Sequence, residues 1–170
     1  MMEPMGETTD VIAAWLELMA CPLCEAELEQ DGDALICAGG HRWPISGGVV
    51  RFAQAQALPD QASRDQTASS FAFEWERFGD VRDEWEKNFL DYMQPHGPEF
   101  FDGLRLLDAG TGSGRHSRQA ALYGADVAAV DLGESIDVAR RNVPAQVLTV
   151  QSDLESLPFK PESFLSLIHI

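Results

Sequence analysis

The second half of the chain alternates short apolar runs with amphipathic stretches. The runs have the length of buried strands, and the stretches between them have apolar positions at helical spacing. The predicted strands cover 104–108, 126–131, 146–150 and 164–170, and the predicted helices cover 114–123 and 134–142. Strands that alternate with helices are joined by right-handed crossovers into a parallel sheet. The pattern therefore predicts an α/β fold with a parallel sheet between layers of helices.

The first half of the chain has a weaker pattern of apolar and polar residues, and differences in composition divide it into segments. Apolar residues at helical spacing predict a short helix over 11–20 that ends before Pro22. A hairpin signal, Asp31-Gly32-Asp33, precedes short apolar runs and predicts small strands around a very small core. The next segment is rich in Ala, Gln, Ser and Asp, as linkers are. The predicted units are a helix with a small β module over 1–52, a linker over 53–69, an aromatic-rich leader over 70–103 and the α/β domain over 104–170.

The composition is strongly acidic. Twelve Lys and Arg against 28 Asp and Glu give a net charge of −16, and no basic cluster is visible in the sequence. This charge does not support a phosphate backbone as partner. No apolar stretch approaches the roughly 20 residues of a membrane span, and the N-terminus lacks the basic start of a secretory signal. We therefore expect a cytoplasmic protein without a membrane partner.

A glycine-rich turn follows the first strand of the α/β domain. Asp108 ends the strand, and Gly110, Gly112 and Gly114 come before the next helix. Glycines here permit a tight turn and the close approach of a ligand to the backbone. A dinucleotide fingerprint, GxGxxG, would place a third glycine at position 115, which is Arg115. A carboxylate at the strand end also suits a cationic ligand better than a pyrophosphate.

Three segments in order, DAGTGSG, VDLGES and SDLESLPF, resemble the S-adenosylmethionine-dependent methyltransferases of the Rossmann-like class over residues 104–164. The resemblance implies that the cofactor's methionine part lies beside the first segment, its ribose on Asp131, and its adenine beside the next two loops. The cofactor-binding residues it implies are Asp108, Gly110, Thr111, Gly112, Gly114, Asp131, Leu132, Asp153 and Leu154. The alternatives are a domain whose glycines only form a turn, or one that binds NAD.

All three cysteines fall into one pattern with a histidine, C-x2-C-x12-C-x3-H. The pattern consists of Cys21, Cys24, Cys37 and His41. Three thiolates and an imidazole satisfy the tetrahedral preference of zinc, and a module of about 35 residues gains stability from a metal. With four protein ligands the zinc would be structural. The alternative is three free or buried thiols and a surface histidine.

The opening CPxC and the later WPI-x-GG-V stretch resemble the zinc ribbon of the tRNA-methyltransferase activator family. Many members of that family end in a second CxxC, whereas the last ligand here would be His41. A protein partner that contacts the ribbon belongs to the alternative hypothesis of an interaction module. The complete fold prediction is therefore an incomplete, Rossmann-like, three-layer parallel sheet preceded by a small zinc-ribbon β module.

The leader over 70–103 carries seven aromatic residues between positions 71 and 92, which alternate with charged ones and predict helices near 70–78 and 82–93. Its QTA-SSFAFEW stretch resembles a leader that covers the cofactor pocket in methyltransferases with this kind of ribbon. Core packing against the sheet explains the same aromatic residues. Beside the glycine turn, we expect His116 to be a solvated residue at the start of a helix, while Arg115 is a candidate for the ligand's carboxylate.

The sequence therefore predicts methyl transfer from S-adenosylmethionine to an acceptor that it does not identify. No catalytic residue can be named. We expect a C-terminally truncated fragment of a longer enzyme, possessing little activity of its own, in which residues 165–170 are not native. Two rival hypotheses are an interaction module with a non-catalytic Rossmann remnant and an NAD-dependent oxidoreductase.

Overall fold

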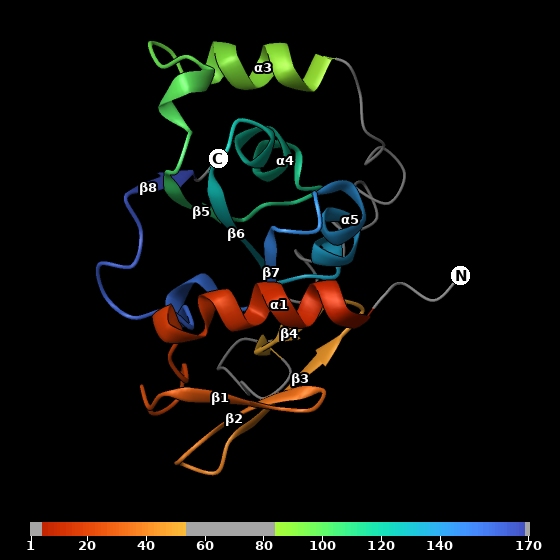
Figure 1. Cartoon of the computed structure of the whole chain (residues 1–170), viewed down its shortest axis with the longest axis vertical. Coiled ribbons are helices and arrows are strands. Elements are labelled where there is room, and N and C mark those ends of the chain that lie inside the picture. The colour runs from red at the N-terminus through yellow and green to blue at the C-terminus, as the bar shows by residue number, and fades with distance from the viewer. Residues whose placement is uncertain (1–4, 54–83, 169–170) are drawn as a thin grey trace.

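The computed structural model describes residues 5–53 and 84–168 (Figure 1). The helices are α1 (Met5–Trp15), α3 (Glu84–Tyr92), α4 (Arg115–Leu122) and α5 (Ser135–Asn142). The strands are β1 (Leu28–Asp31), β2 (Ala34–Cys37), β3 (Arg42–Ser46), β4 (Val49–Arg51), β5 (Arg105–Ala109), β6 (Asp126–Asp131), β7 (Leu148–Gln151) and β8 (Ser166–Ile168). Short 3-10 turns cover Leu16–Leu18, Pro98–Phe100 and Leu154–Ser156.

The described strands form one continuous sheet in the order β1-β2-β3-β4-β7-β6-β5-β8. The first four strands are antiparallel hairpins, and the last four are parallel. The order β7-β6-β5-β8 is the 3-2-1-4 order of a doubly wound nucleotide-binding sheet. The predicted α/β fold with a mostly parallel sheet is therefore confirmed.

The small N-terminal β module, β1–β4, is joined to the parallel sheet through β4. Val50 pairs in parallel with Val150, and Arg51 pairs with Gln151. The side chain of Thr149 also donates a hydrogen bond of 3.0 Å to the Gly48 carbonyl. Backbone pairing across this seam makes the module an extension of the sheet, although we predicted its boundary from composition alone.

Each face of the parallel sheet has its own hydrophobic cluster. Along β6, Ala128 and Val130 belong to the cluster that contains Trp15 of α1. The alternate positions Val127 and Ala129 belong to the cluster that contains Ala120 of α4. Because successive side chains of a strand point to opposite faces, α1 and α4 cover opposite sides of the sheet. The predicted three layers are therefore present in the described part of the chain.

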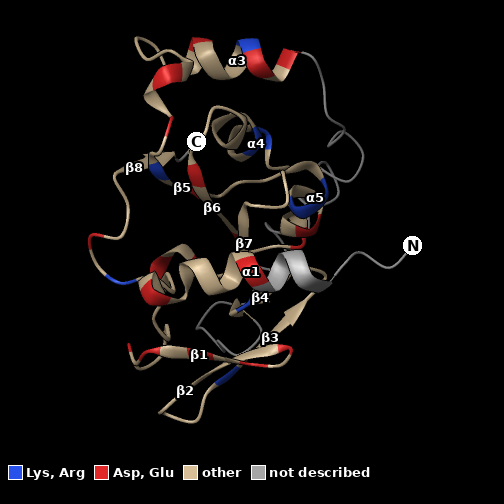
Figure 2. Ribbon diagram, viewed as in Figure 1, with Lys and Arg blue, Asp and Glu red and all other residues tan. Residues whose placement is uncertain are grey.

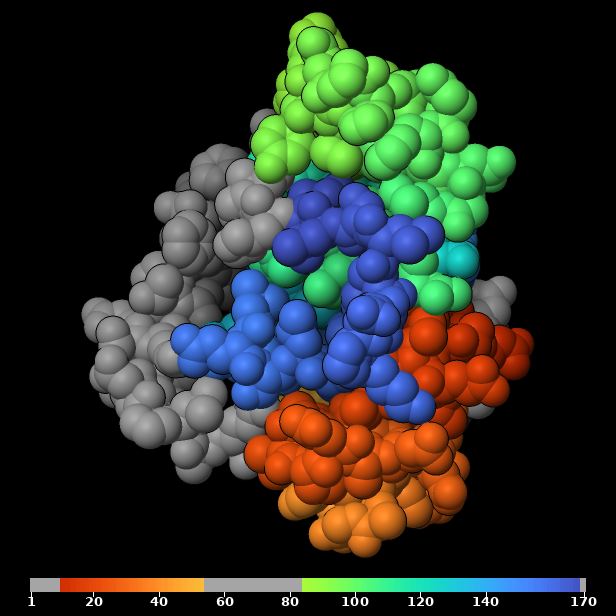
Figure 3. Space-filling view, turned by 90° about the vertical axis from the view of Figure 1, so that its left-hand side faces the viewer, coloured from red at the N-terminus to blue at the C-terminus, as the bar shows by residue number. Residues whose placement is uncertain are grey.

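Acidic residues lie on most described elements (Figure 2). Helix α3 carries three of them and a single lysine. Figures 1 and 3 place α3 at one end of the molecule's long axis and the β1–β2 hairpin at the other. None of the described helices is long and apolar enough to cross a membrane.

Most predicted elements agree with the structure to within two residues, but the first helix differs. It covers Met5–Trp15 rather than 11–20. The chain leaves the helix early because Met19 forms a β-bridge with Phe159, and the Ala20 amide donates to the Pro158 carbonyl at 3.0 Å. This tertiary pairing competes with helical propensity. Most of the predicted linker and the predicted helix near 70–78 lie outside the described residues.

Candidate cofactor and metal sites

The glycine turn after β5 uses backbone angles that side chains rarely adopt. Gly110, Gly112 and Gly114 all have positive φ, at 81°, 56° and 80°. The amides of Gly110 and Thr111 both donate to the Val130 carbonyl at 2.9 Å, which holds the turn against the end of β6. Glycine is favoured at these three positions because a Cβ would strain the backbone there.

Asp108 supports this turn from inside the protein. Its Oδ2 accepts hydrogen bonds from the Thr111 hydroxyl at 2.8 Å and from the hydroxyl and amide of Ser117 at 2.6 and 3.1 Å. Burial raises the pKa of Asp108, while these hydrogen bonds act against that rise. One carboxylate oxygen is therefore occupied by the turn and α4, so this acid does not present both oxygens to a ligand.

Asp131 joins the turn after β5 to the loop after β6. Its Oδ2 accepts from the Gly112 amide at 2.9 Å, and its Oδ1 accepts from the Gly133 amide at 3.1 Å. The two strands are paired in register up to Ala109 and Val130, so their carboxyl ends lie side by side. The structure thus brings the first two predicted binding segments together on one carboxylate.

The loop after β7 reaches the same edge of the sheet. Gln151, the last residue of β7, donates from Nε2 to the Leu132 carbonyl at 3.0 Å. Asp153 is buried, and its Oδ1 accepts from the Glu155 amide at 2.9 Å and so caps a 3-10 turn. Leu154 is exposed beside it. The crevice at the carboxyl ends of the strands is where open α/β sheets bind ligands.

Two residues that the sequence did not single out also shape the turn. The Asn142 side chain, at the end of α5, donates to the Ser113 carbonyl at 2.9 Å. The Ser113 hydroxyl itself is buried and has no hydrogen-bond partner within the described part of the chain. Ser113 lies within the glycine motif, but the sequence did not show its contact with Asn142, because the turn and the end of α5 meet only in the folded chain.

His116 is buried, which contradicts the predicted solvated position. Its ring stacks on Tyr92 at a centroid distance of 5.7 Å and contacts Phe89 at 5.8 Å, both from α3. Burial, assisted by the neighbouring Arg115, lowers the pKa of His116 to about 4. The aromatic spacing of α3 was the sequence signal for this cover, but the sequence did not show which helix α3 packs against.

The predicted metal ligands come together in the small β module. The ligand atoms of Cys21, Cys24, Cys37 and His41 all lie within 4.8 Å of one another. The Nδ1 of His41 lies 3.3–3.5 Å from each of the three sulfurs, and the sulfurs of Cys24 and Cys37 are 3.7 Å apart. Zinc bonds of about 2.3 Å to sulfur and 2.0–2.1 Å to nitrogen give tetrahedral edges of about 3.8 and 3.6 Å.

Two tight turns present these ligands. The Glu25 amide donates to the Cys21 carbonyl at 2.8 Å, and the Gly40 amide donates to the Cys37 carbonyl at 2.9 Å. Burial alone raises the pKa of the Cys37 thiol, but hydrogen bonds from the His41 backbone and ring lower it to about 6. Cys37 therefore favours the thiolate, which is the form of cysteine that binds metals.

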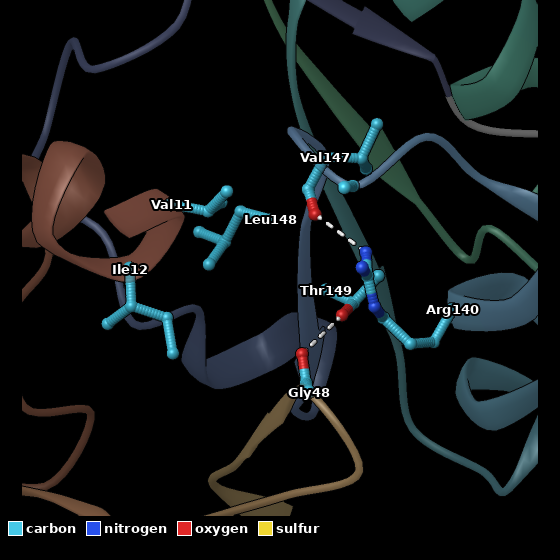
Figure 4. A pocket seen from close by; sticks show the side chains of 8 residues that line it. Val11, Ile12, Gly48, Arg140, Val147, Leu148 and Thr149 are labelled. Atoms are coloured by element: carbon cyan, nitrogen blue, oxygen red, sulfur yellow. Dashed lines mark hydrogen bonds between the residues drawn. The ribbon is translucent and has the colours of Figure 1, made fainter. Parts of the chain in front are cut away.

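A small hollow lies between α1, β7 and the turn before β4 (Figure 4). Its lining consists of Val11, Ile12, Gly48, Arg140, Ala145, Val147, Leu148 and Thr149. Arg140 donates to the Val147 carbonyl at 3.3 Å, so its charged group is engaged with the backbone. None of the predicted cofactor or metal residues lines this hollow, which is a packing gap at the seam between the two parts of the sheet.

Comparison with known proteins gives a family match and structural matches to methyltransferases. Residues 107–167 match the family model described as a methyltransferase domain. Among curated proteins, the biotin biosynthesis bifunctional protein BioHC of Cellvibrio japonicus (strain Ueda107) is 40% identical over 75 residues, which are 44% of this chain and 14% of that protein.

Two solved structures are examples of the structural matches. Protein arginine methyltransferase 10 of Arabidopsis thaliana is 25% identical with a TM-score of 0.46, and the match covers 58% of this chain and 30% of that one. Phosphoethanolamine N-methyltransferase 2 of Haemonchus contortus is 24% identical with a TM-score of 0.46, over 66% of this chain and 29% of that one. The chain thus spans less than a third of each of these relatives. The family match supports a methyltransferase domain over residues 107–167.

Proposed function

We propose that this chain is part of an S-adenosylmethionine-dependent methyltransferase and that the edge of the sheet around Asp131 binds the cofactor. The observation that carries the proposal is the carboxylate of Asp131, which bonds the glycine turn and the next loop together. It does so within the segment that matches a methyltransferase domain.

The residues around Asp131 fit an adenosine-containing cofactor. A carboxylate has about four acceptor sites, and protein amides occupy one on each oxygen of Asp131, so both oxygens can accept from ribose hydroxyls. Leu132 follows directly and supplies an apolar side chain for the adenine. Asp153 and Leu154 extend this surface from the end of β7. The proposed nucleoside site thus uses consecutive residues of two neighbouring loops.

The glycine turn fits the other end of the cofactor. Gly110 at the start of the turn is exposed, and the buried Ser113 hydroxyl in the same turn lacks a partner among the described residues. We assign Gly110, Thr111, Gly112 and Gly114 to this side, with Asp108 supporting them from below. When bound, the cofactor supplies an electrophilic methyl group. The residues named here bind and orient it, and transfer to a good nucleophile relies chiefly on proximity and alignment.

The curated relative's printed name concerns biotin biosynthesis, but the match covers only 14% of that protein. This share is too small to carry its substrate over to this chain.

We also propose a structural metal, with zinc as the ion, at Cys21, Cys24, Cys37 and His41. The distance between the Cys24 and Cys37 sulfurs and the three distances from His41 Nδ1 to the sulfurs are within about 0.3 Å of the tetrahedral edges expected for zinc. Four protein ligands leave no open coordination position for catalysis, so the ion would stabilise the small β module. A protein partner at this module stays a prediction from the sequence.

Calorimetric titration of S-adenosylhomocysteine into the purified chain tests the function, with metal content measured on the same sample. Saturable binding with one equivalent of zinc supports both proposals. Preferential binding of NADH would contradict the cofactor assignment. Bound zinc without any cofactor binding would favour an interaction module instead.

A matched pair of variants tests the site itself. Asp131→Asn removes the charge that assists hydrogen bonds to the ribose, which is worth about 1.5–3 kcal/mol and lowers affinity for S-adenosylhomocysteine by about 10- to 150-fold. Asp126→Asn at the opposite end of the same strand is the control, because Asp126 is exposed at the first residue of β6. Equal affinities of the two variants would remove Asp131 from the site.

A further inference from the structure

A buried arginine links the small β module to the proposed nucleoside loop. Arg51 is the last residue of β4 and is 8% exposed. Its guanidinium donates to both oxygens of Asp137, at 2.6 and 3.1 Å, and to the side chain of Gln151 at 3.2 Å. Two further bonds of 3.2 Å reach the carbonyl and hydroxyl of Ser46. The guanidinium thus contacts β7, α5 and its own module at once.

The loop over residues 131–134 is joined to both partners of this arginine. Asp137 is in the first turn of α5, immediately after the loop. Gln151 accepts from Arg51 through Oε1 and donates through Nε2 to the Leu132 carbonyl. The side-chain amide of Gln151 therefore couples the guanidinium of Arg51 to the loop backbone through two hydrogen bonds. This bond holds Leu132 itself, and the carboxylate of Asp131, which precedes Leu132, accepts from the amide of Gly133, which follows it.

The backbone connection at this seam is short. The ladder between β4 and β7 contains two residue pairs, and one of them is Arg51 with Gln151. A ladder of this length fixes the direction of the strands but leaves the loop beyond β6 without backbone pairing to the module. The polar contacts of Arg51 with Gln151 and Asp137 restrain the loop relative to the module instead. A buried charge needs partners in defined positions, so the geometry of Asp137 and Gln151 is fixed as well.

We propose that Arg51 is a positioning residue for the cofactor's nucleoside site, acting on the Leu132 loop through Gln151 and Asp137. This inference rests on the proposed function for its ligand. It assigns the small β module a second role, because the module supplies a side chain that orders the cofactor loop in addition to holding its own metal cluster.

Gln151→Glu is the sharpest test. Glutamate keeps an acceptor for Arg51 but replaces the donor that faces the Leu132 carbonyl with another oxygen. We expect the variant to fold with the wild-type melting temperature, while amide hydrogen exchange over 131–137 becomes about tenfold faster or more. Affinity for S-adenosylhomocysteine and for adenosine falls by the same factor, since both contain the nucleoside.

Arg51→Met is the second variant, and it keeps the apolar stem while removing the guanidinium. It should accelerate exchange over 131–137 and weaken adenosine binding in the same direction. The matched control is Arg42→Met, because Arg42 is an exposed arginine of the same module that pairs only with Asp31 and Asp33 among the described residues. This control should leave both readouts unchanged.

Two results would overturn the inference. One is unchanged exchange over 131–137 in Gln151→Glu, and the other is an equal rise in exchange throughout the protein, which indicates a general loss of stability. The exchange measurement needs no ligand. A wild-type chain that binds no S-adenosylhomocysteine would therefore contradict the proposed function, while the exchange data still decide the role of Arg51.

Discussion

Acidification should destabilise this protein through His116, whose ring is buried between α3 and α4. The ring stacks on Tyr92 and contacts Phe89, and its pKa is lowered from 6.5 to about 4. The unfolded chain therefore binds a proton at a higher pH than the folded chain does. The stabilising contribution is complete above the unfolded pKa of 6.5 and is lost as the pH falls towards 4.

The two pKa values set the size of the effect. With a pKa of 6.5 in the unfolded chain and about 4 in the folded chain, proton binding lowers the free energy of unfolding by at most about 2.4 kcal/mol between about pH 7 and pH 4.5. Water at the edge of the ring reduces this, because Tyr92 above it is half exposed. We expect a loss of about 1–2 kcal/mol, which corresponds to about 2–8 °C in melting temperature for a chain of this size.

Urea denaturation at several pH values should compare the wild type with His116→Phe, which keeps a ring between the two helices. The difference in free energy of unfolding between these proteins isolates the histidine, because carboxylate titration and metal loss are common to both. His96→Phe is the control, since His96 is exposed in the loop after α3. If the difference in free energy of unfolding between the wild type and His116→Phe stays constant from about pH 7 to 4.5, the burial of this ring is refuted.

Two pairs of glycine variants test the turns. Gly114→Ala should cost about 1–3 kcal/mol more stability than Gly103→Ala in thermal unfolding; both positions have positive φ, but only at Gly114 would a Cβ clash, with α5 at 2.9–3.1 Å. Equal losses would contradict the close packing of α4 on α5. Gly39→Ala should release zinc at a lower chelator concentration than Gly40→Ala, because a Cβ at Gly39 would lie 2.9 Å from the Cys24 sulfur, whereas a Cβ at Gly40 would meet no atom and would strain only the backbone, whose φ is 80°. Equal retention of zinc by the two variants would contradict a clash between residue 39 and the Cys24 sulfur.

Local patterns in the sequence were sufficient for the elements of the parallel sheet. The apolar runs and glycine signals placed β5, β6 and α4 to within a residue or two. Short-range spacing also identified Cys21, Cys24, Cys37 and His41, because two tight turns bring these ligands together with little help from the rest of the fold. The site assignments around Asp131 remain predictions, now with a geometry that can be tested.

The sequence could not show contacts between segments that are distant along the chain. His116 looked solvated because its own helix gives no sign of the α3 cover. The support that Asp108 gives to the turn was also hidden, because its bonds from Thr111 and Ser117 form only when the turn closes over it.

What the sequence by itself determined is the set of strands, the glycine turn and the metal-ligand pattern, since each depends on residues close together in the chain. Only the tertiary structure decided that the small β module continues the parallel sheet and that Arg51 reaches the loop after β6. The physical reason is that pairing between β4 and β7 joins residues about 100 positions apart. No local pattern of apolar and polar residues encodes which strand edge such a module will meet.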